Sequence, residues 1–278
     1  MLGLGFVLGH YAFISFVAWQ GIGRRFYNPN TAVVSKITGY GIAIIASILA
    51  TGFTMVVNND SSYRIFSNFE ALQVFNFVLI IGLALLMTPT RQQVQDWMRL
   101  RHQGKFAGRF WSDLLWGDRS PAIVSIAVMS ICSTIIMAIA AIQHPFLNDT
   151  SAVIGGLILQ CGILVIFASL IQLILLRKKQ RGIWLIVTIG SLTVLPFLLF
   201  LIFSERFTGA ILFGLFSAFP ITAAEQAFST MLAWSLVGQC IGVIGSLMII
   251  QKQIRRLGDS EVKTLLTSAA ESPKNMLT

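Results

Sequence analysis

The chain has 278 residues, of which 55% are hydrophobic and only 11% are charged, with a formal net charge of +9. Soluble domains carry about 25% charged residues, so the composition excludes an ordinary soluble protein. The basic residues flank apolar runs and do not share one surface, which favours a positive-inside membrane protein over a nucleic-acid-binding one.

Seven apolar stretches approach the length of about 20 residues that a helix needs to cross a hydrocarbon core. In chain order they cover residues 3–20, 37–57, 69–88, 121–143, 152–175, 183–203 and 226–250. They predict an all-α, polytopic bundle over residues 1–250, followed by a basic, partly disordered cytoplasmic tail at 251–278. Pro196 is expected to kink the sixth stretch.

The connections between these stretches differ sharply in charge. All but two of the twenty Lys and Arg residues fall in the first, third and fifth connections and in the tail. The exceptions are Arg64 and Arg206. The positive-inside rule therefore predicts an outside N-terminus and a cytoplasmic C-terminus.

A further apolar segment, FTGAILFGLFSAFP at 207–220, is too short to span comfortably. Gly209, Gly214 and Pro220 interrupt it. An eighth span here would move the basic tail outside, against the charge distribution. The segment predicts a hairpin that is either re-entrant or interfacial.

The connection at 89–120 is long, basic and patterned. Val94, Trp97, Met98 and Arg101 follow helical spacing, and Arg91, Gln95 and Arg99 occupy another face. A second short amphipathic segment contains the apolar set Phe110, Trp111, Leu114 and Leu115. Such segments anchor at the lipid interface or dock a cytoplasmic partner, and one helix can do both. The candidate docking residues are Arg91, Asp96, Trp97, Arg99 and Arg101.

Polar side chains at membrane depth are costly and therefore informative. Glu70, Gln73 and Asn76 are three residues apart and share one helix face, and Glu225 precedes the last span. These four residues are candidates for a polar pathway. The alternatives are solvation for Glu70, interhelical hydrogen bonding for Asn76, and solvation or helix capping for Glu225.

Small residues at four-residue spacing predict close helix packing rather than a particular dimer. Gly5 and Gly9 form one such pair, and Gly238, Gly242 and Ser246 form a series in the last span.

No catalytic or cofactor motif is present. The sequence has no GxxxxGK[ST] phosphate loop, no HExxH and no GxSxG. His10, the one ionisable residue of the first span, is expected to hydrogen-bond a neighbouring helix. Cys132, Cys161 and Cys240 lie singly in apolar runs and predict no disulfide or CxxC metal site. We expect no enzyme activity, no cofactor and no metal.

Several phrases resemble those of a known family. They are GRRFYNPNTAVVSKITGY, SNFEALQVFNF, RQQVQDWMRLRHQ, WSDLLWGDRSPA and SERFTGAILFGLFSAFP. Together they are similar to cyanobacterial permease-like subunits of ATP-binding-cassette exporters of the type-2 class. The resemblance implies a bundle that works as a homo- or heterodimer with a separate cytoplasmic ATPase, and a re-entrant element before the final span. Members of this family typically have six spans and a cytoplasmic N-terminus, and here the chain departs from them.

The sequence thus favours a membrane-spanning subunit of an ATP-driven exporter of unknown substrate, with the 89–120 connection contacting the ATPase. The alternative is a non-transporting membrane protein that assembles or anchors a larger complex. The expected partners are the lipid bilayer and the ATPase, not nucleic acid. The expected location is a bacterial plasma membrane, or a thylakoid membrane if the source is cyanobacterial.

Overall fold

The computed structural model describes residues 15–24, 26–27, 31–57, 62–102, 110–143, 150–176, 181–203, 210–227 and 229–271. Within these ranges the chain is helical and contains no strand. The prediction of an all-helical protein is confirmed for this part of the chain.

Six of the described helices are long and apolar enough to cross a membrane. They correspond to the second through seventh predicted spans, so the chain is a membrane protein. Their bounds are α2 (Lys36–Val57), α3 (Ser62–Met87), α6 (Ile123–Gln143), α7 (Thr150–Leu175), α8 (Arg181–Phe203) and α11 (Ser229–Glu271). The predicted first span, 3–20, falls largely outside the described residues, although residues 15–24 are helical.

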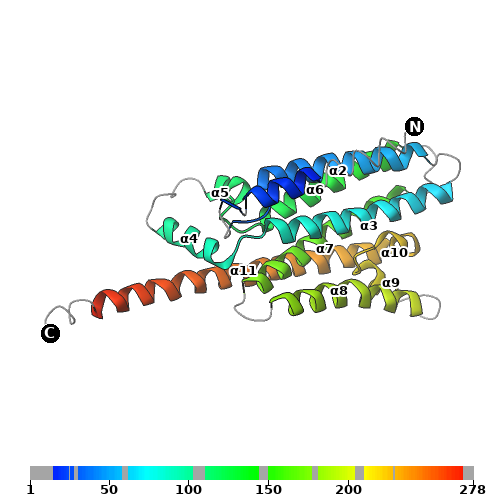
Figure 1. Ribbon diagram of the computed structural model, residues 1–278. Coiled ribbons are helices and arrows are strands. Elements are labelled where there is room, and N and C mark those ends of the chain that lie inside the picture. The colour runs from blue at the N-terminus through cyan, green and yellow to red at the C-terminus, as the bar shows by residue number, and fades with distance from the viewer. Residues whose placement is uncertain are drawn as a thin grey trace.

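The last helix is much longer than the span it contains. Its membrane-length part covers Ser229–Ile254, whereas α11 runs on to Glu271. Figure 1 shows this extension projecting well past the bundle. Residues 251–271, which the sequence assigns to a partly disordered tail, are therefore a continuous helix.

The long helices run side by side in alternating directions (Figure 1). The short helices α4 (Arg91–His102) and α5 (Phe110–Trp116) lie at one end of the bundle, beside the extension of α11. We call this the basic end, because Arg24, Lys36, Arg99 and Arg119 lie there in or beside the connections between spans, and Lys252 lies there near the end of the membrane-length part of α11. At the other end lie α9 (Ala210–Leu215) and α10 (Ile221–Gln226).

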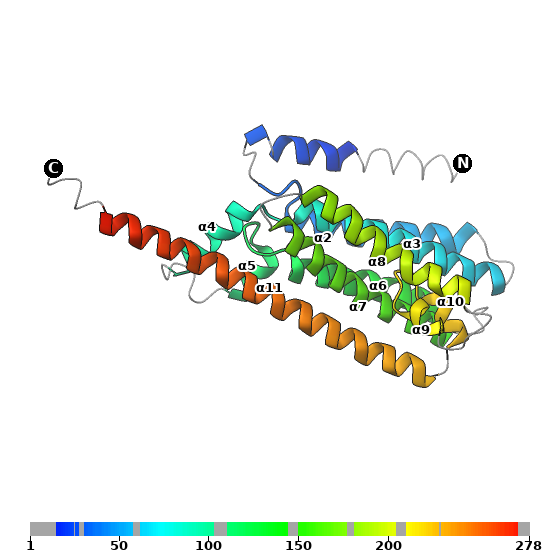
Figure 2. The ribbon, with the colours of Figure 1, turned by 90° about the horizontal axis from the view of Figure 1, so that it is seen from below.

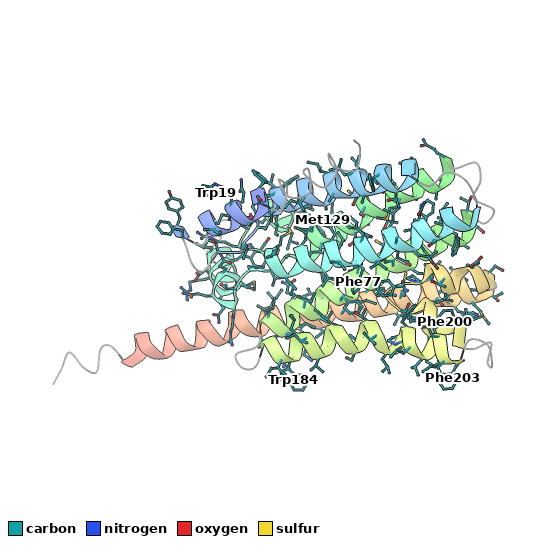
Figure 3. All side chains as sticks on the ribbon, turned by 45° about the vertical axis from the view of Figure 1, so that its right-hand side comes forward. Trp19, Phe77, Met129, Trp184, Phe200 and Phe203 are labelled. Atoms are coloured by element: carbon teal, nitrogen blue, oxygen red, sulfur yellow. The ribbon has the colours of Figure 1, made fainter. Side chains whose placement is uncertain are left out.

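The core is centred on α7. In the apolar part of this helix 67% of the residues are buried, whereas in that of α8 only 6% are. Figure 3 shows Phe77 of α3 and Met129 of α6 among the packed side chains, while Trp184 and Phe203 project outward from α8. A helix that is apolar all round and largely exposed is suited to lipid or to another membrane protein.

The predicted small-residue series of α11 is used inside the molecule. A Cβ added at Gly238 would lie 2.8 Å from Cζ of Phe216, and one added at Gly242 would lie 3.0 Å from Cδ1 of Ile166. Ser246 donates a hydrogen bond to Oγ of Ser169 at 3.1 Å. The series therefore lets α11 approach α7 and the α9–α10 hairpin closely, as small residues do in membrane bundles. Gly5 and Gly9 lie outside the described residues.

Candidate functional site

A chain of buried polar side chains crosses the middle of the bundle. Ser133 of α6 donates a hydrogen bond to Oδ1 of Asn76 on α3 at 2.7 Å. Its hydroxyl hydrogen is thereby used, so Ser47 of α2 is the donor in the 2.8 Å bond that joins the two serine hydroxyls. Nδ2 of Asn76 donates to Oε1 of Gln160 on α7 at 3.3 Å. Four helices are joined by neutral groups, which avoids the cost of burying charge.

This series of hydrogen bonds ends on the hairpin formed by α9 and α10. The helix is broken between Leu215 and Ile221, and the ladder of intrahelical hydrogen bonds is interrupted there. The N–H groups of Phe216 and Ser217 still bond back to α9, and other backbone groups of the break bond to side chains of neighbouring spans. Nε2 of Gln160 donates to the carbonyl oxygen of Gln73 at 2.7 Å and to that of Ala218, in the break, at 3.3 Å. Both amide hydrogens of Gln160 are consequently used.

Two other glutamines act on the ends of the break. The N–H of Ile221, the first residue of α10, donates to Oε1 of Gln73 at 3.3 Å. Pro220, at the N-cap, makes no side-chain capping bond of its own. Nε2 of Gln239 on α11 donates to the carbonyl of Leu215, the last residue of α9, at 3.2 Å. Gln73, Gln160 and Gln239, from three different spans, thus satisfy the broken backbone; we call them the glutamine clamp.

Packing fixes the same segment. Phe219, in the break, makes edge-to-face contacts with Phe77 of α3 and Phe197 of α8, with ring centroids 5.6 and 5.7 Å apart. A Cβ added at Gly156 of α7 would lie 2.7 Å from Cα of Ile221, so α10 lies directly on the α7 backbone. The hairpin is therefore a wedge held from several sides, not a free surface loop.

All four candidate polar-pathway residues lie on or beside this wedge, but one of them does not face the bundle. Gln73 and Asn76 are buried, and Oε1 of Glu70 accepts a hydrogen bond from Thr222 of α10 at 2.9 Å. Glu225 is exposed and does not join them. The predicted stripe on α3 does face inward, and its described contacts hold the hairpin in place.

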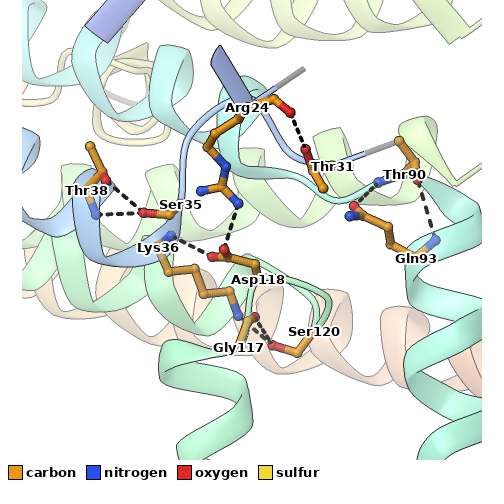
Figure 4. A network of polar contacts seen from close by, with 10 residues as sticks. All are labelled: Arg24, Thr31, Ser35, Lys36, Thr38, Thr90, Gln93, Gly117, Asp118 and Ser120. Atoms are coloured by element: carbon orange, nitrogen blue, oxygen red, sulfur yellow. Dashed lines mark hydrogen bonds and ion pairs between the residues drawn. The ribbon is translucent and has the colours of Figure 1, made fainter. Parts of the chain in front are cut away.

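At the basic end, one buried lysine fastens α5 to α2. Lys36 is 1% exposed, and its Nζ donates to Oγ of Ser120 at 2.6 Å (Figure 4). It also donates to the carbonyls of Leu114 at 2.6 Å and Pro121 at 3.1 Å. All three ammonium hydrogens have acceptors. A buried cation is tolerated only with such complete pairing.

Asp118, in the loop after α5, connects this lysine to the N-terminal helical segment. Its Oδ1 accepts from the backbone N–H of Lys36 at 3.1 Å, at the N-terminus of α2, where negative charge is favourable. Its Oδ2 pairs with the guanidinium of Arg24 at 2.7 Å. Figure 4 shows both contacts. The carboxylate of Asp118 therefore joins Arg24 to the N-terminus of α2.

The described part of the 89–120 connection contains two helices, α4 and α5. α4 is amphipathic, with Trp97 buried and Arg99 exposed. Trp97, Met98 and Leu114 form a small buried cluster between α4 and α5, against which Val124 and Ile254 pack. Nε1 of Trp97 donates to Oδ2 of Asp113 at 3.3 Å. Trp111, which the sequence groups with the apolar face of α5, is instead 68% exposed. We call this unit the α4–α5 platform.

The candidate docking residues of α4 fall into two groups. Trp97 is buried within the platform and is not accessible to a partner. Arg91 is half-buried, and Asp96 and Arg99 are close to half exposed and lie 3.8 Å apart. Beside them is a polar recess of about 330 Å³, lined also by Gln92 and Arg119. The side chain of Arg101 lies outside the described residues.

Three anchoring residues escape the sequence analysis: Lys36, Asp118 and Gln160. Gln160 carries a usable signal, since a lone amide at the centre of an apolar span needs a partner inside the bundle. Lys36 counts in the sequence only as one more flanking charge. Nothing local shows that the fold buries it.

The site offers hydrogen-bonding and packing surfaces but no reactive constellation. In the described part of the chain, no three His, Cys, Asp or Glu side chains are grouped to hold a metal ion. No protein-family model, curated protein or solved structure matches this chain.

Proposed function

We propose that the protein is a membrane-spanning subunit of an ATP-driven exporter, working with a separate ATPase at its basic end. The observation that carries the proposal is the α4–α5 platform. It is a helical unit at the end of the bundle where the basic connections gather, with an exposed charged face on α4. In this proposal a separate protein binds ATP, because this chain has no GxxxxGK[ST] phosphate loop.

The order of elements supports this proposal. Among the described residues, two spans precede the platform and four follow it, and the α9–α10 hairpin comes directly before the last of these four. A six-span core with a re-entrant element before the final span is what the resemblance to type-2 exporter permeases implies. The burial of the hairpin break between α3, α7 and α11 favours a re-entrant segment over an interfacial one.

The contacts of the platform suit a part that transmits movement. It meets α2 through Lys36, α6 through Val124 and α11 through Ile254. A displacement of the whole platform would therefore reach three spans at once. In this proposal the basic end lies in the cytoplasm, the N-terminus lies outside, and the membrane is a bacterial plasma membrane or a thylakoid membrane.

The test is retention of an ATPase by the full chain in mild detergent. Wild-type protein should co-purify with a protein that carries a GxxxxGK[ST] motif and hydrolyses ATP. Arg99→Glu should release that protein about tenfold more readily, because charged groups at an interface control association. The variant should fold, since an exposed ion pair such as Arg99–Asp96 contributes at most about 1 kcal/mol.

Arg256→Glu is the matched control, because Arg256 is an exposed arginine at the same end, on α11. It should leave retention of the ATPase unchanged. Absence of any ATPase from the wild-type preparation, or equal release by both variants, contradicts the proposal.

A second candidate function is assembly or anchoring of a membrane complex without transport. The observation that favours it is the glutamine clamp, in which the buried amides hold the bundle together and line no channel that the described residues reveal. In that case the wild-type protein should co-purify with membrane proteins and with no ATP-hydrolysing subunit.

A further inference from the structure

An apolar groove separates the N-terminal helical segment from the bundle. The groove has a volume of about 840 Å³ and lies between residues 17–26 of that segment and α2 and α3. Val17, Ile22 and Phe26 form one wall, and Val78, Gly82 and Leu86 are part of the other. None of the described residues that line it has a polar side chain. Figure 2 shows the segment running alongside the bundle rather than within it.

The position of the groove along α3 indicates its surroundings. The lining residues Val78 to Leu86 lie in the half of the span Phe66–Met87 that is nearer the basic end. They cover about 12 Å at 1.5 Å per residue, and one leaflet of a bilayer core is about 15 Å thick. The volume is within the range of about 300–1,000 Å³ that small-molecule sites occupy. An acyl chain from the leaflet at the basic end therefore matches the groove in length, depth and polarity.

A polar recess adjoins this groove at the basic end. Val33 lines the groove and Thr31 lines the recess of about 330 Å³. Because these residues are two positions apart in the chain, their Cα atoms are at most about 7 Å apart. Thr31 and Gln93 both line this recess, and Figure 4 shows Thr31 hydrogen-bonded to the carbonyl of Arg24. An apolar channel beside a polar recess has the division of a phospholipid into chain and headgroup.

The charges of the recess indicate the sign of the headgroup. Asp96 is matched by Arg99 at 3.8 Å, and Asp118 is matched by Arg24 at 2.7 Å. Arg119, exposed and lining the recess, adds a further positive charge. The recess is thus suited to a phosphate with a net negative charge.

We propose that this groove and recess bind one anionic phospholipid of the leaflet at the basic end. Its acyl chain lies between the N-terminal helical segment and α3, and its phosphate lies beside Arg119. This inference does not depend on the exporter proposal, because it uses neither the ATPase nor the glutamine clamp.

The chain-binding part is tested with the full chain in phosphatidylcholine vesicles that contain phosphatidylglycerol carrying a diazirine on its acyl chain. After photolysis, peptides covering residues 15–27 and 78–87 should be labelled severalfold more than the exposed helix α8, which samples bulk lipid. Gly82→Phe should reduce this labelling to the α8 level by filling the groove. Gly245→Phe should retain the wild-type pattern. At both glycines an added Cβ meets no atom within 4 Å, so neither variant need disturb the fold.

The headgroup part is tested by comparing diazirine-labelled phosphatidylglycerol with phosphatidylcholine. Wild type should prefer phosphatidylglycerol, and Arg119→Glu should lower the preference by about fivefold, since a basic residue near the surface contributes about 1 kcal/mol to binding of anionic lipid. Arg256→Glu should keep the preference. Equal labelling of the groove and α8 in wild type, no effect of Gly82→Phe, a cross-linked second copy in place of lipid, or equal labelling by both lipids would overturn the proposal.

Discussion

In this protein, single side chains form hydrogen bonds with backbone groups that regular secondary structure leaves unpaired. A hairpin that breaks its helix inside a membrane bundle leaves backbone groups with no water to bind. The glutamine clamp meets this need because a neutral amide carries both donors and an acceptor: Gln73 accepts from Ile221, Gln239 donates to Leu215, and Gln160 does both. Gln160 contributes most, since it bonds Asn76, Gln73 and Ala218 together.

Replacement of Gln160 by leucine tests this role. Gln160→Leu keeps a similar volume but leaves the Ala218 carbonyl and the Asn76 amide without their partner, at a cost of about 1–3 kcal/mol. We expect a lower midpoint of thermal unfolding in detergent, followed by size-exclusion chromatography. Gln251→Leu, at an exposed position on α11, is the control and should leave the midpoint unchanged. Equal midpoints for wild type and Gln160→Leu would show that the clamp does not stabilise the fold.

At the scale of elements, the contacts that place the hairpin depend on close backbone approach. α10 lies against α7 at Gly156, where Ile221 leaves no room for a side chain on the glycine. The two arms of the hairpin also touch, since a Cβ at Gly214 would lie 2.5 Å from Cβ of Ala223. Backbone atoms cannot rotate away as the end of a long side chain can, so these glycines set the separation of the elements.

A pair of glycine-to-alanine variants measures this constraint. Gly156→Ala should destabilise the protein by about 1–3 kcal/mol through overpacking, outweighing the gain of about 1 kcal/mol in helix propensity. Gly190→Ala, on α8 with no atom near the added Cβ, should be neutral or slightly stabilising. Thermal unfolding in detergent distinguishes the two. The packing account fails if both substitutions stabilise equally.

On the scale of the whole molecule, alternating helices separate two chemically different ends. One carries the platform, the Arg24–Asp118 pair and the extension of α11, and the other carries the hairpin. The positive-inside rule predicts that the basic end faces the cytoplasm. The exposed residues Arg256 and Glu225 belong to opposite ends and can report the orientation.

Thiol labelling of intact cells tests this orientation. In a background in which Cys132, Cys161 and Cys240 are replaced by alanine, a membrane-impermeant maleimide should label Glu225→Cys. It should reach Arg256→Cys only after the membrane is permeabilised. Labelling of Arg256→Cys in intact cells would reverse the orientation, and labelling of both would show a mixed topology.

The sequence by itself determined the class of protein and most of its elements. Length and hydropathy located six helices that the structure contains, because the cost of exposing apolar groups or breaking backbone hydrogen bonds in lipid acts on each segment separately. Helical spacing likewise predicted the amphipathic segments of the 89–120 connection. The stripe of Gln73 and Asn76 was correctly assigned to an inward face.

Only the tertiary structure decided which polar groups meet. Gln73 contacts Ile221 across 148 positions of sequence, and Lys36 contacts Ser120 across 84. Such pairs depend on how the spans pack, and hydropathy is blind to that packing because every span is apolar. For the same reason, the sequence could not show that Trp97, a candidate for docking, is buried. Nor could it show the groove beside Gly82, which exists only because of how the helices are placed.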